Sequence, residues 1–336
     1  MKKTILTTLV LLCSCTAKDR TIMISSYEGD ISDAPGKVIC ELHSLNDLGD
    51  LDSFSIVDDT CFAVVSGRSA VTLFNTATGE EIRQIGRSGR AKNEYLAPTL
   101  VRACNGKIFV WSSSSLQFQE YSRTGEHLNT YKYESAIRDF FPIKDKLIIY
   151  TAGKRQEHLI DIYDLAAKEM TKSLTTASKE HQMLAHSTSV SPMFIEDGIL
   201  LYMPYDKQTL YKYFLEGSSE PELLADINCE SFTVREIDNN TKRRDYLRNN
   251  PMNVSLMKKG NTLYFLTKEG TISNSGNNRY YSLYKTDLSK GTCLAHYKIG
   301  SLSQPYLFNV YKSTLYYIQH EISDNNDRYY LKELNI

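Results

Sequence analysis

The sequence predicts an all-β protein, a six-bladed β-propeller. The 336 residues include 23 Tyr and 12 Phe against one Trp, and half-buried aromatic side chains of this kind favour strands. From about residue 52 onward, short apolar runs alternate with Gly, Asn and Asp turn signals, a pattern typical of strands. The third strands of successive units end near residues 74, 121, 163, 213, 286 and 332, which are 47, 42, 50, 73 and 46 residues apart. A strand-based repeat of about 40 to 50 residues indicates propeller blades.

The charged residues nearly cancel, since 39 Lys and Arg face 40 Asp and Glu and the formal net charge is −1. Nucleic-acid-binding proteins usually show a strong basic excess, so we expect no nucleic-acid partner. Five cysteines lie beyond the first twenty residues and lack metal-ligand spacing, so we expect free, buried thiols. They are Cys40, Cys61, Cys104, Cys229 and Cys293.

The first twenty residues predict export. Lys2 and Lys3 precede an apolar run, Ile5–Leu12, that fits a signal peptide and is too short to span a membrane. The run ends in Leu12-Cys13-Ser14-Cys15, which resembles the lipobox of bacterial lipoproteins with Cys15 as the lipidated residue. The alternative is an ordinary secretory signal that contains Cys.

The lipobox resemblance implies a signal peptide over 1–14 and a lipid anchor and tether over 15–35. The protein would then lie in the cell envelope, on the periplasmic side or at the cell surface. We expect membrane contact through the lipid anchor only, and two or three acyl chains on Cys15 would hold it stably.

The propeller is predicted over residues 36–336, and its first three units each offer four strands. Asn105-Gly106, between two apolar runs of the second unit, is a strong hairpin signal. The predicted strands are Phe54–Val57, Cys61–Val65, Val71–Phe74 and Glu81–Ile85; Thr99–Ala103, Ile108–Trp111, Leu116–Tyr121 and His127–Tyr131; and Phe140–Ile143, Leu147–Tyr150, Leu159–Asp164 and Met170–Leu174.

The long step between the fourth and fifth units predicts one blade plus an insertion at 227–251, where a short amphipathic helix would fit before Pro251. The strands predicted for units four to six are Met193–Ile195, Ile199–Met203, Leu210–Phe214 and Glu222–Ala225; Val254–Met257, Thr262–Leu266, Tyr281–Tyr284 and Cys293–Ile299; and Tyr306–Val310, Thr314–Ile318 and Tyr329–Leu334.

The sixth unit has three strands, which would leave an open sheet edge. The apolar run Lys37–Leu42 precedes unit one and has no partner there. We therefore expect this N-terminal strand to complete the last blade and close the ring.

The segment Ile85-Gly86-Arg87-Ser88-Gly89-Arg90-Ala91-Lys92-Asn93-Glu94-Tyr95 resembles the "GrkGqGpgEy" segment between blades one and two of TolB-like six-bladed β-propeller lipoproteins of Bacteroides and relatives. Ala91-Lys92-Asn93 replaces the second Gly-Pro, so the match is partial. The resemblance spans nearly the whole chain through the lipobox, the spacing and the unit count. It implies an envelope lipoprotein with six blades, and it implies no established catalytic residues.

No pattern in the sequence predicts a catalytic residue, a metal site or a cofactor. His181 and His186 lie five residues apart, whereas a zinc-binding helix needs four with an internal Glu. The predicted inner strands carry few chemically active groups, with Arg102 as the main exception. A non-catalytic binding module is therefore the leading interpretation, and a propeller-type lyase, esterase or glycosidase acting at the channel mouth is the alternative.

Ligand binding is predicted on the connections from an outer strand to the next inner strand, because long loops on a rigid scaffold are where binding concentrates. Two such connections, 86–97 and 227–251, would rise on one face around one channel. The candidate ligand-binding residues are Arg87, Arg90, Lys92 and Tyr95 on the first, and Arg243, Arg244 and Tyr246 on the second. The arginines would hold anionic groups and the tyrosines would supply an apolar wall. The expected partner is a small molecule, a glycan or an envelope protein.

Overall fold

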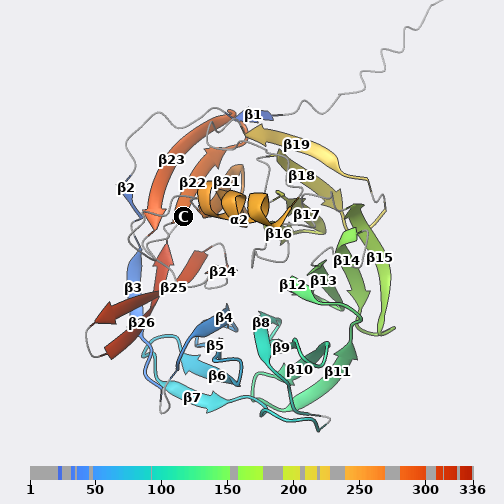
Figure 1. Cartoon of the computed structure of the whole chain (residues 1–336), viewed down its shortest axis with the longest axis vertical. Coiled ribbons are helices and arrows are strands. Elements are labelled where there is room, and N and C mark those ends of the chain that lie inside the picture. Colours follow the sequence, from blue (N-terminus) through green and yellow to red (C-terminus); the bar gives the residue numbers. More distant parts are fainter. Residues whose placement is uncertain are drawn as a thin grey trace, which may run out of the picture.

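The computed structural model describes residues 22–24, 32–34, 36–44, 48–91, 93–151, 158–176, 192–204, 209–217, 220–227, 239–268, 281–299, 308–312, 314–323 and 326–334. The strands of these residues form six sheets arranged in a ring (Figure 1). The predicted six-bladed β-propeller is confirmed.

Blades 1 to 3 each consist of four consecutive antiparallel strands, running from the centre of the ring outward. Blade 1 contains β4 (Leu51–Ile56), β5 (Cys61–Ser66), β6 (Ala70–Asn75) and β7 (Glu81–Gln84); blade 2 contains β8 (Pro98–Cys104), β9 (Lys107–Ser112), β10 (Gln117–Ser122) and β11 (His127–Lys132); blade 3 contains β12 (Ile137–Ile143), β13 (Lys146–Thr151), β14 (His158–Asp164) and β15 (Glu169–Thr176).

Blades 4 to 6 each include one strand from the N-terminal part of the chain at their outer edge. Blade 4 contains β16 (Met193–Glu196), β17 (Ile199–Tyr202), β18 (Thr209–Phe214), β19 (Glu222–Ile227) and β1 (Ile22–Ile24); blade 5 contains β20 (Met252–Lys259), β21 (Thr262–Lys268), β22 (Tyr281–Asp287), β23 (Thr292–Ile299) and β2 (Ser32–Asp33); blade 6 contains β24 (Phe308–Tyr311), β25 (Thr314–Ser323), β26 (Asn326–Leu334) and β3 (Lys37–Glu41).

The ring closes through β3, as predicted. This strand pairs antiparallel with β26, with Cys40 opposite Leu331. The ladder continues one residue further, where the Leu42 amide donates to the Tyr329 carbonyl at 2.8 Å. Nearly the whole propeller separates β3 from β26 in the chain, so backbone hydrogen bonds between the two ends of the propeller complete the last blade.

The hydrophobic core is divided into six clusters, and each cluster lies between two neighbouring blades. The cluster between blades 6 and 1 contains Leu42, Phe54, Ile318 and Leu331. Closure therefore buries apolar surface from both ends of the chain, in addition to forming backbone hydrogen bonds.

Local sequence explains the strand positions within a blade. The second strand of blade 1, β5, is buried at every residue, as expected for a strand covered by neighbouring blades on both faces. The outermost strand, β7, is mostly exposed. The turn between β8 and β9 has positive φ at Asn105 and Gly106, which matches the tight hairpin that Asn-Gly favours.

The structure corrects the predicted tether over 15–35. Two pieces of that segment belong to the propeller, because β1 pairs in parallel with β19 and β2 pairs in parallel with β23. Ile24 is buried in the cluster between blades 4 and 5. The two strands have only three and two residues, fewer than the runs of about 4–8 residues that indicate strands in a sequence, so the sequence pattern did not indicate them.

Two further features concern the elements near the centre of the ring. The inner strand of blade 3, β12, begins at Ile137 and not at Phe140, so it includes Asp139. The insertion between blades 4 and 5 contains the expected helix, α2 (Asn240–Asn249). Asn239 caps it, since its side-chain oxygen accepts hydrogen bonds from the amides of Thr241 and Lys242.

Candidate functional site

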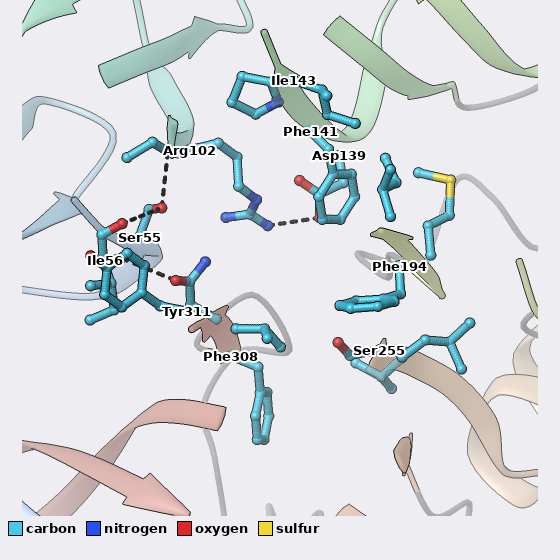
Figure 2. Close-up of a pocket in the computed structure, with 18 residues that line it drawn as sticks. Ser55, Ile56, Arg102, Asp139, Phe141, Ile143, Phe194, Ser255, Phe308 and Tyr311 are labelled. Carbon is cyan, nitrogen blue, oxygen red and sulfur yellow. Dashed lines mark hydrogen bonds and ion pairs between the residues drawn. The ribbon is translucent and has the colours of Figure 1, made fainter. Parts of the chain in front are cut away.

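The inner strands of all six blades line a cavity of about 200 Å³ at the centre of the ring (Figure 2). Each of β4, β8, β12, β16, β20 and β24 contributes side chains to it. Residues up to about 250 positions apart in the chain therefore meet at one place, from Ser55 and Ile56 to Asn309 and Tyr311.

A buried ion pair lies on one side of the cavity. Arg102 Nη2 is 2.7 Å from Asp139 Oδ2, and the two side chains are 7% and 1% exposed. Arg102 Nη1 also donates to Ser53 Oγ and to the carbonyls of Phe54 and Val101, at 3.2, 3.3 and 2.9 Å. The Nε atom of Arg102 is buried and has no acceptor among the described residues.

Polar side chains next to this pair join the inner strands of neighbouring blades. Ser53 Oγ and Ser55 Oγ of blade 1 accept hydrogen bonds from the amides of Val101 and Ala103 of blade 2, at 3.2 and 3.0 Å. Asn309 Oδ1 of blade 6 accepts from the Ile56 amide at 3.1 Å. These contacts hold blades 6, 1 and 2 in a defined arrangement, so the guanidinium of Arg102 sits on a rigid support.

The other side of the cavity is mostly apolar, apart from the Ser255 hydroxyl. Met193 and Phe194 come from blade 4, Leu256 from blade 5 and Phe308 from blade 6. Figure 2 shows the rings of Phe194 and Phe308 across the cavity from Arg102. Phe141 borders the polar side, with its ring centroid 5.9 Å from Arg102 Cζ. The cavity is thus divided into a polar part and an apolar, partly aromatic part.

Sequence reasoning identified Arg102 but missed its partner. Asp139 stands just before the predicted inner strand of blade 3, and the strand begins two residues before it. Alternate residues of a strand share a face, so Asp139, Phe141 and Ile143 all point into the cavity once the strand is extended. A period-two pattern continued upstream from Phe141 would have found the carboxylate.

The described residues of the predicted ligand-binding segment 86–97 lie between β7 and β8. Glu94 accepts hydrogen bonds from the Ala91 amide at 2.7 Å and from Arg87 Nε at 2.6 Å. Both contacts lower the pKa of the Glu94 carboxyl, and the hydrogen bond from the Ala91 amide has the largest effect. Arg87 is 75% exposed and paired, and Arg90 is exposed. Lys92 lies outside the described residues.

Tyr95 has a structural position, which corrects its predicted role as an apolar wall of an open site. The side chain is 1% exposed and belongs to the cluster between blades 1 and 2. Its hydroxyl donates to the Ile85 carbonyl at 2.9 Å and accepts from the Val71 amide at 3.2 Å. Tyr95 therefore presents almost no surface to a ligand.

Tyr246 is corrected in the same way. It is 4% exposed and packs in the cluster between blades 5 and 6, which also contains Phe308 of the cavity lining. Tyr246 anchors α2 to the propeller, while Arg243 is half-buried and Arg244 is exposed. Arg244 Nε donates to the Asn240 carbonyl at 3.4 Å.

The two predicted connections both follow an outer strand and precede an inner one, so the topology puts them on the same face of the ring. Figure 1 shows α2 on the side formed by blades 4 to 6, and β7 and β8 on the opposite side of the ring. Among the described residues, no hydrogen bond or ion pair joins the two segments. A common site for their arginines stays a prediction.

Within the described part of the chain, no group of three or more His, Cys, Asp and Glu side chains is placed to hold a metal ion. Cys40, Cys61, Cys104 and Cys293 are free thiols; the first two are buried, whereas the other two are half-buried. No helix of the described residues has the length and apolar character needed to cross a membrane. Cys15, His181, His186 and Cys229 lie outside the described residues.

The fold and the cavity define a closed propeller with a small central site, and comparison with known proteins agrees with that class. The profile of DUF5128, described as a 6-bladed beta-propeller family, matches residues 43–324. The chain therefore belongs to this family. No curated protein matches it in sequence.

Two solved structures from Bacteroides share the fold. A member of the DUF4221 family from Bacteroides vulgatus has 10% identity and a TM-score of 0.63, with 91% of this chain and 100% of that chain covered. A Bacteroides fragilis protein whose given name calls it an exported protein has 11% identity and a TM-score of 0.62, with 94% and 99% covered. At these identities the likeness shows the fold alone.

Proposed function

We propose that this protein is a lipid-anchored, non-catalytic binding module of the bacterial cell envelope that takes a small molecule into its central channel. The observation that carries the proposal is the cavity of about 200 Å³, with the Arg102–Asp139 pair on one side and aromatic side chains on the other. Small-molecule sites typically combine apolar walls with a few fixed polar groups.

Binding is favoured over the enzymatic alternative by the groups that line the cavity. A glycosidase of the usual kind needs two carboxyl groups, and Asp139 is the one carboxylate among the described lining residues. An esterase needs a nucleophile within hydrogen-bond reach of a base. Ser55 Oγ instead accepts from the Ala103 amide, and the described lining contains no histidine.

The envelope location rests on the lipobox at Cys15 and is supported by the exported Bacteroides fragilis protein of the same fold. Seven residue steps separate Cys15 from Ile22, which span at most about 25 Å. β1 runs parallel to β19, so it begins on the face of the ring that carries the β18–β19 turn, and the chain reaches the propeller from that face. An anchor at Cys15 would thus leave the opposite face, with α2 and segment 86–97, pointing away from the membrane.

A fragment screen by ligand-observed NMR tests the binding proposal. We expect hits that compete for one site and lose binding in Ser255→Trp, because Ser255 lines the cavity and an indole there would fill it. Ser114→Trp is the matched control, since Ser114 is exposed on the β9–β10 turn and does not line the cavity. If no fragment separates the two variants, the channel is not a binding site.

A further inference from the structure

We infer that the channel ligand is an uncharged molecule of about one ring that carries a hydrogen-bond acceptor beside an apolar body. This inference rests on the proposed function, and it specifies the chemical class that the channel would bind. It follows from the charge balance of the lining, from the unsatisfied donor on Arg102, and from the size and composition of the cavity.

The charges that line the cavity cancel. Arg102 and Asp139 are the two charged side chains among the described lining residues, and they are paired at 2.7 Å. A charged ligand would lose its hydration on entry and would find each opposite charge already neutralised. An anion would also meet Asp139, and a cation would meet Arg102. A neutral ligand avoids both costs.

A hydrogen-bond acceptor is indicated by Arg102 Nε. This buried atom has no acceptor among the described residues, although Nη1 and Nη2 are both bonded. A buried donor without a partner is unfavourable, so the Arg102 side chain would gain a hydrogen bond by turning Nε toward a ligand oxygen in the adjacent cavity. A carbonyl or ether oxygen meets this need without adding charge.

The size and the lining of the cavity indicate the size and shape of the ligand. A cavity of about 150 Å³ in another protein holds one benzene molecule. The present cavity of about 200 Å³ therefore has room for one ring and a short substituent. Phe194 and Phe308 lie across from the ion pair, where a planar ring would pack by offset stacking or edge to face.

Four single-ring probes test the inference in the full-length protein: acetophenone, ethylbenzene, benzoate and benzylamine. They are similar in shape and differ in charge and in the acceptor. At pH 7 we expect acetophenone to bind at least about tenfold more tightly than benzoate or benzylamine, and several-fold more tightly than ethylbenzene. Binding should be lost in Ser255→Trp and kept in Ser114→Trp.

The outcomes separate this inference from the proposed function. If benzoate or benzylamine binds as tightly as acetophenone and is lost in Ser255→Trp, the channel binds ligands but the inferred neutrality is wrong. If ethylbenzene matches acetophenone, the role of Arg102 Nε is wrong. If none of the four probes binds, the inferred class is overturned, whereas the fragment screen alone decides whether the channel binds at all.

A charge-altering variant gives a second readout. Asp139→Asn keeps an oxygen that accepts from Arg102 and gives the lining one net positive charge. We expect the preference to move toward benzoate, by about tenfold relative to acetophenone. An unchanged ranking in a folded variant would overturn the electrostatic argument. If the variant does not fold, the ranking of the four probes on the unaltered protein still decides.

Discussion

Removing one partner of the Arg102–Asp139 pair should destabilise the propeller far more than removing both. Asp139→Ala leaves a guanidinium that is 93% buried without its counter-charge, and such a change costs about 3–5 kcal/mol. That is a large part of the typical ~5–15 kcal/mol stability of a folded domain. Replacing the pair together, as Arg102→Met with Asp139→Leu, removes both charges and fills the space with apolar atoms. We expect this double variant to stay within about 2 kcal/mol of the unaltered protein.

An exposed ion pair in the same protein supplies the control. Lys312 and Asp59 are 2.6 Å apart, close to the spacing of the buried pair, but their side chains are 63% and 68% exposed. Asp59→Ala should therefore leave the free energy of unfolding nearly unchanged. Urea unfolding followed by fluorescence would measure all variants, because Trp111 is the one tryptophan of the chain and is buried in blade 2.

Two results would refute this reasoning. If Asp139→Ala costs no more than Asp59→Ala, the buried charge is not the source of the loss. If the double variant is as unstable as Asp139→Ala, the hydrogen bonds of Arg102 to Ser53 and the backbone matter more than its charge. The expected result has a functional consequence, because a fold that tolerates an apolar pair does not require the ion pair for stability.

Three further predictions concern the ring, the anchor and pH. Leu42→Ala should lower the free energy of unfolding by about 2–3 kcal/mol, because Leu42 is buried between blades 6 and 1. Val38 lies on the same segment but is 47% exposed, so Val38→Ala should lower it by about 0.5 kcal/mol or less. Equal losses in the two variants would contradict closure through β3. Cys15→Ala should abolish labelling by a radioactive fatty acid, and undiminished label would refute lipidation there. Burial opposes ionisation of Glu120, but hydrogen bonds from Lys107, Tyr131 and Asn129 lower its pKa below the ordinary 4.5. The ionised Glu120 carboxylate should therefore stabilise the fold above about pH 4.5, and this effect should be lost as the pH falls through the lowered pKa. Glu120→Gln should reduce the loss of stability at acid pH, measured by urea unfolding. An unchanged loss in this variant would show that other groups cause it.

The sequence predicted most of the fold because a blade is a local unit. Apolar runs and turn residues such as Asn105-Gly106 indicate each strand from residues that are close together in the sequence. Because the blade is repeated, a wrongly assigned strand in one unit can be recognised by comparison with the other units. Closure by Lys37–Leu42 was also predictable, because a missing fourth strand and an unpaired strand elsewhere imply each other. The short parallel strands β1 and β2 were not predictable, since pairs of two or three residues depend on an edge that the rest of the fold provides.

The candidate site was harder to predict because it depends on distant residues meeting. Arg102 stood out as a charge on an inner strand, but its partner lies 37 positions later and on another blade. Whether a residue of an inner strand faces the channel depends on where that strand begins, and a shift of the start hid Asp139. The predicted tyrosines failed for the opposite reason. Tyr95 follows a polar run and Tyr246 stands among charged residues in the sequence, yet each packs between two blades.

Segment 86–97 and the channel residues are explained by different physical requirements. In segment 86–97, Gly86 has a φ of +61° and leaves no room for a side chain beside Tyr121 and Tyr95. A side chain at Gly89 would collide with Glu94, whose carboxylate holds the loop through Ala91 and Arg87. Folding alone accounts for these residues. The buried Arg–Asp pair is a different case: if the apolar double variant is as stable as expected, folding does not require the pair. In that case, recognition of a ligand would be the better explanation of the pair and its unsatisfied Nε, and specificity should be sought in the channel rather than in the loop.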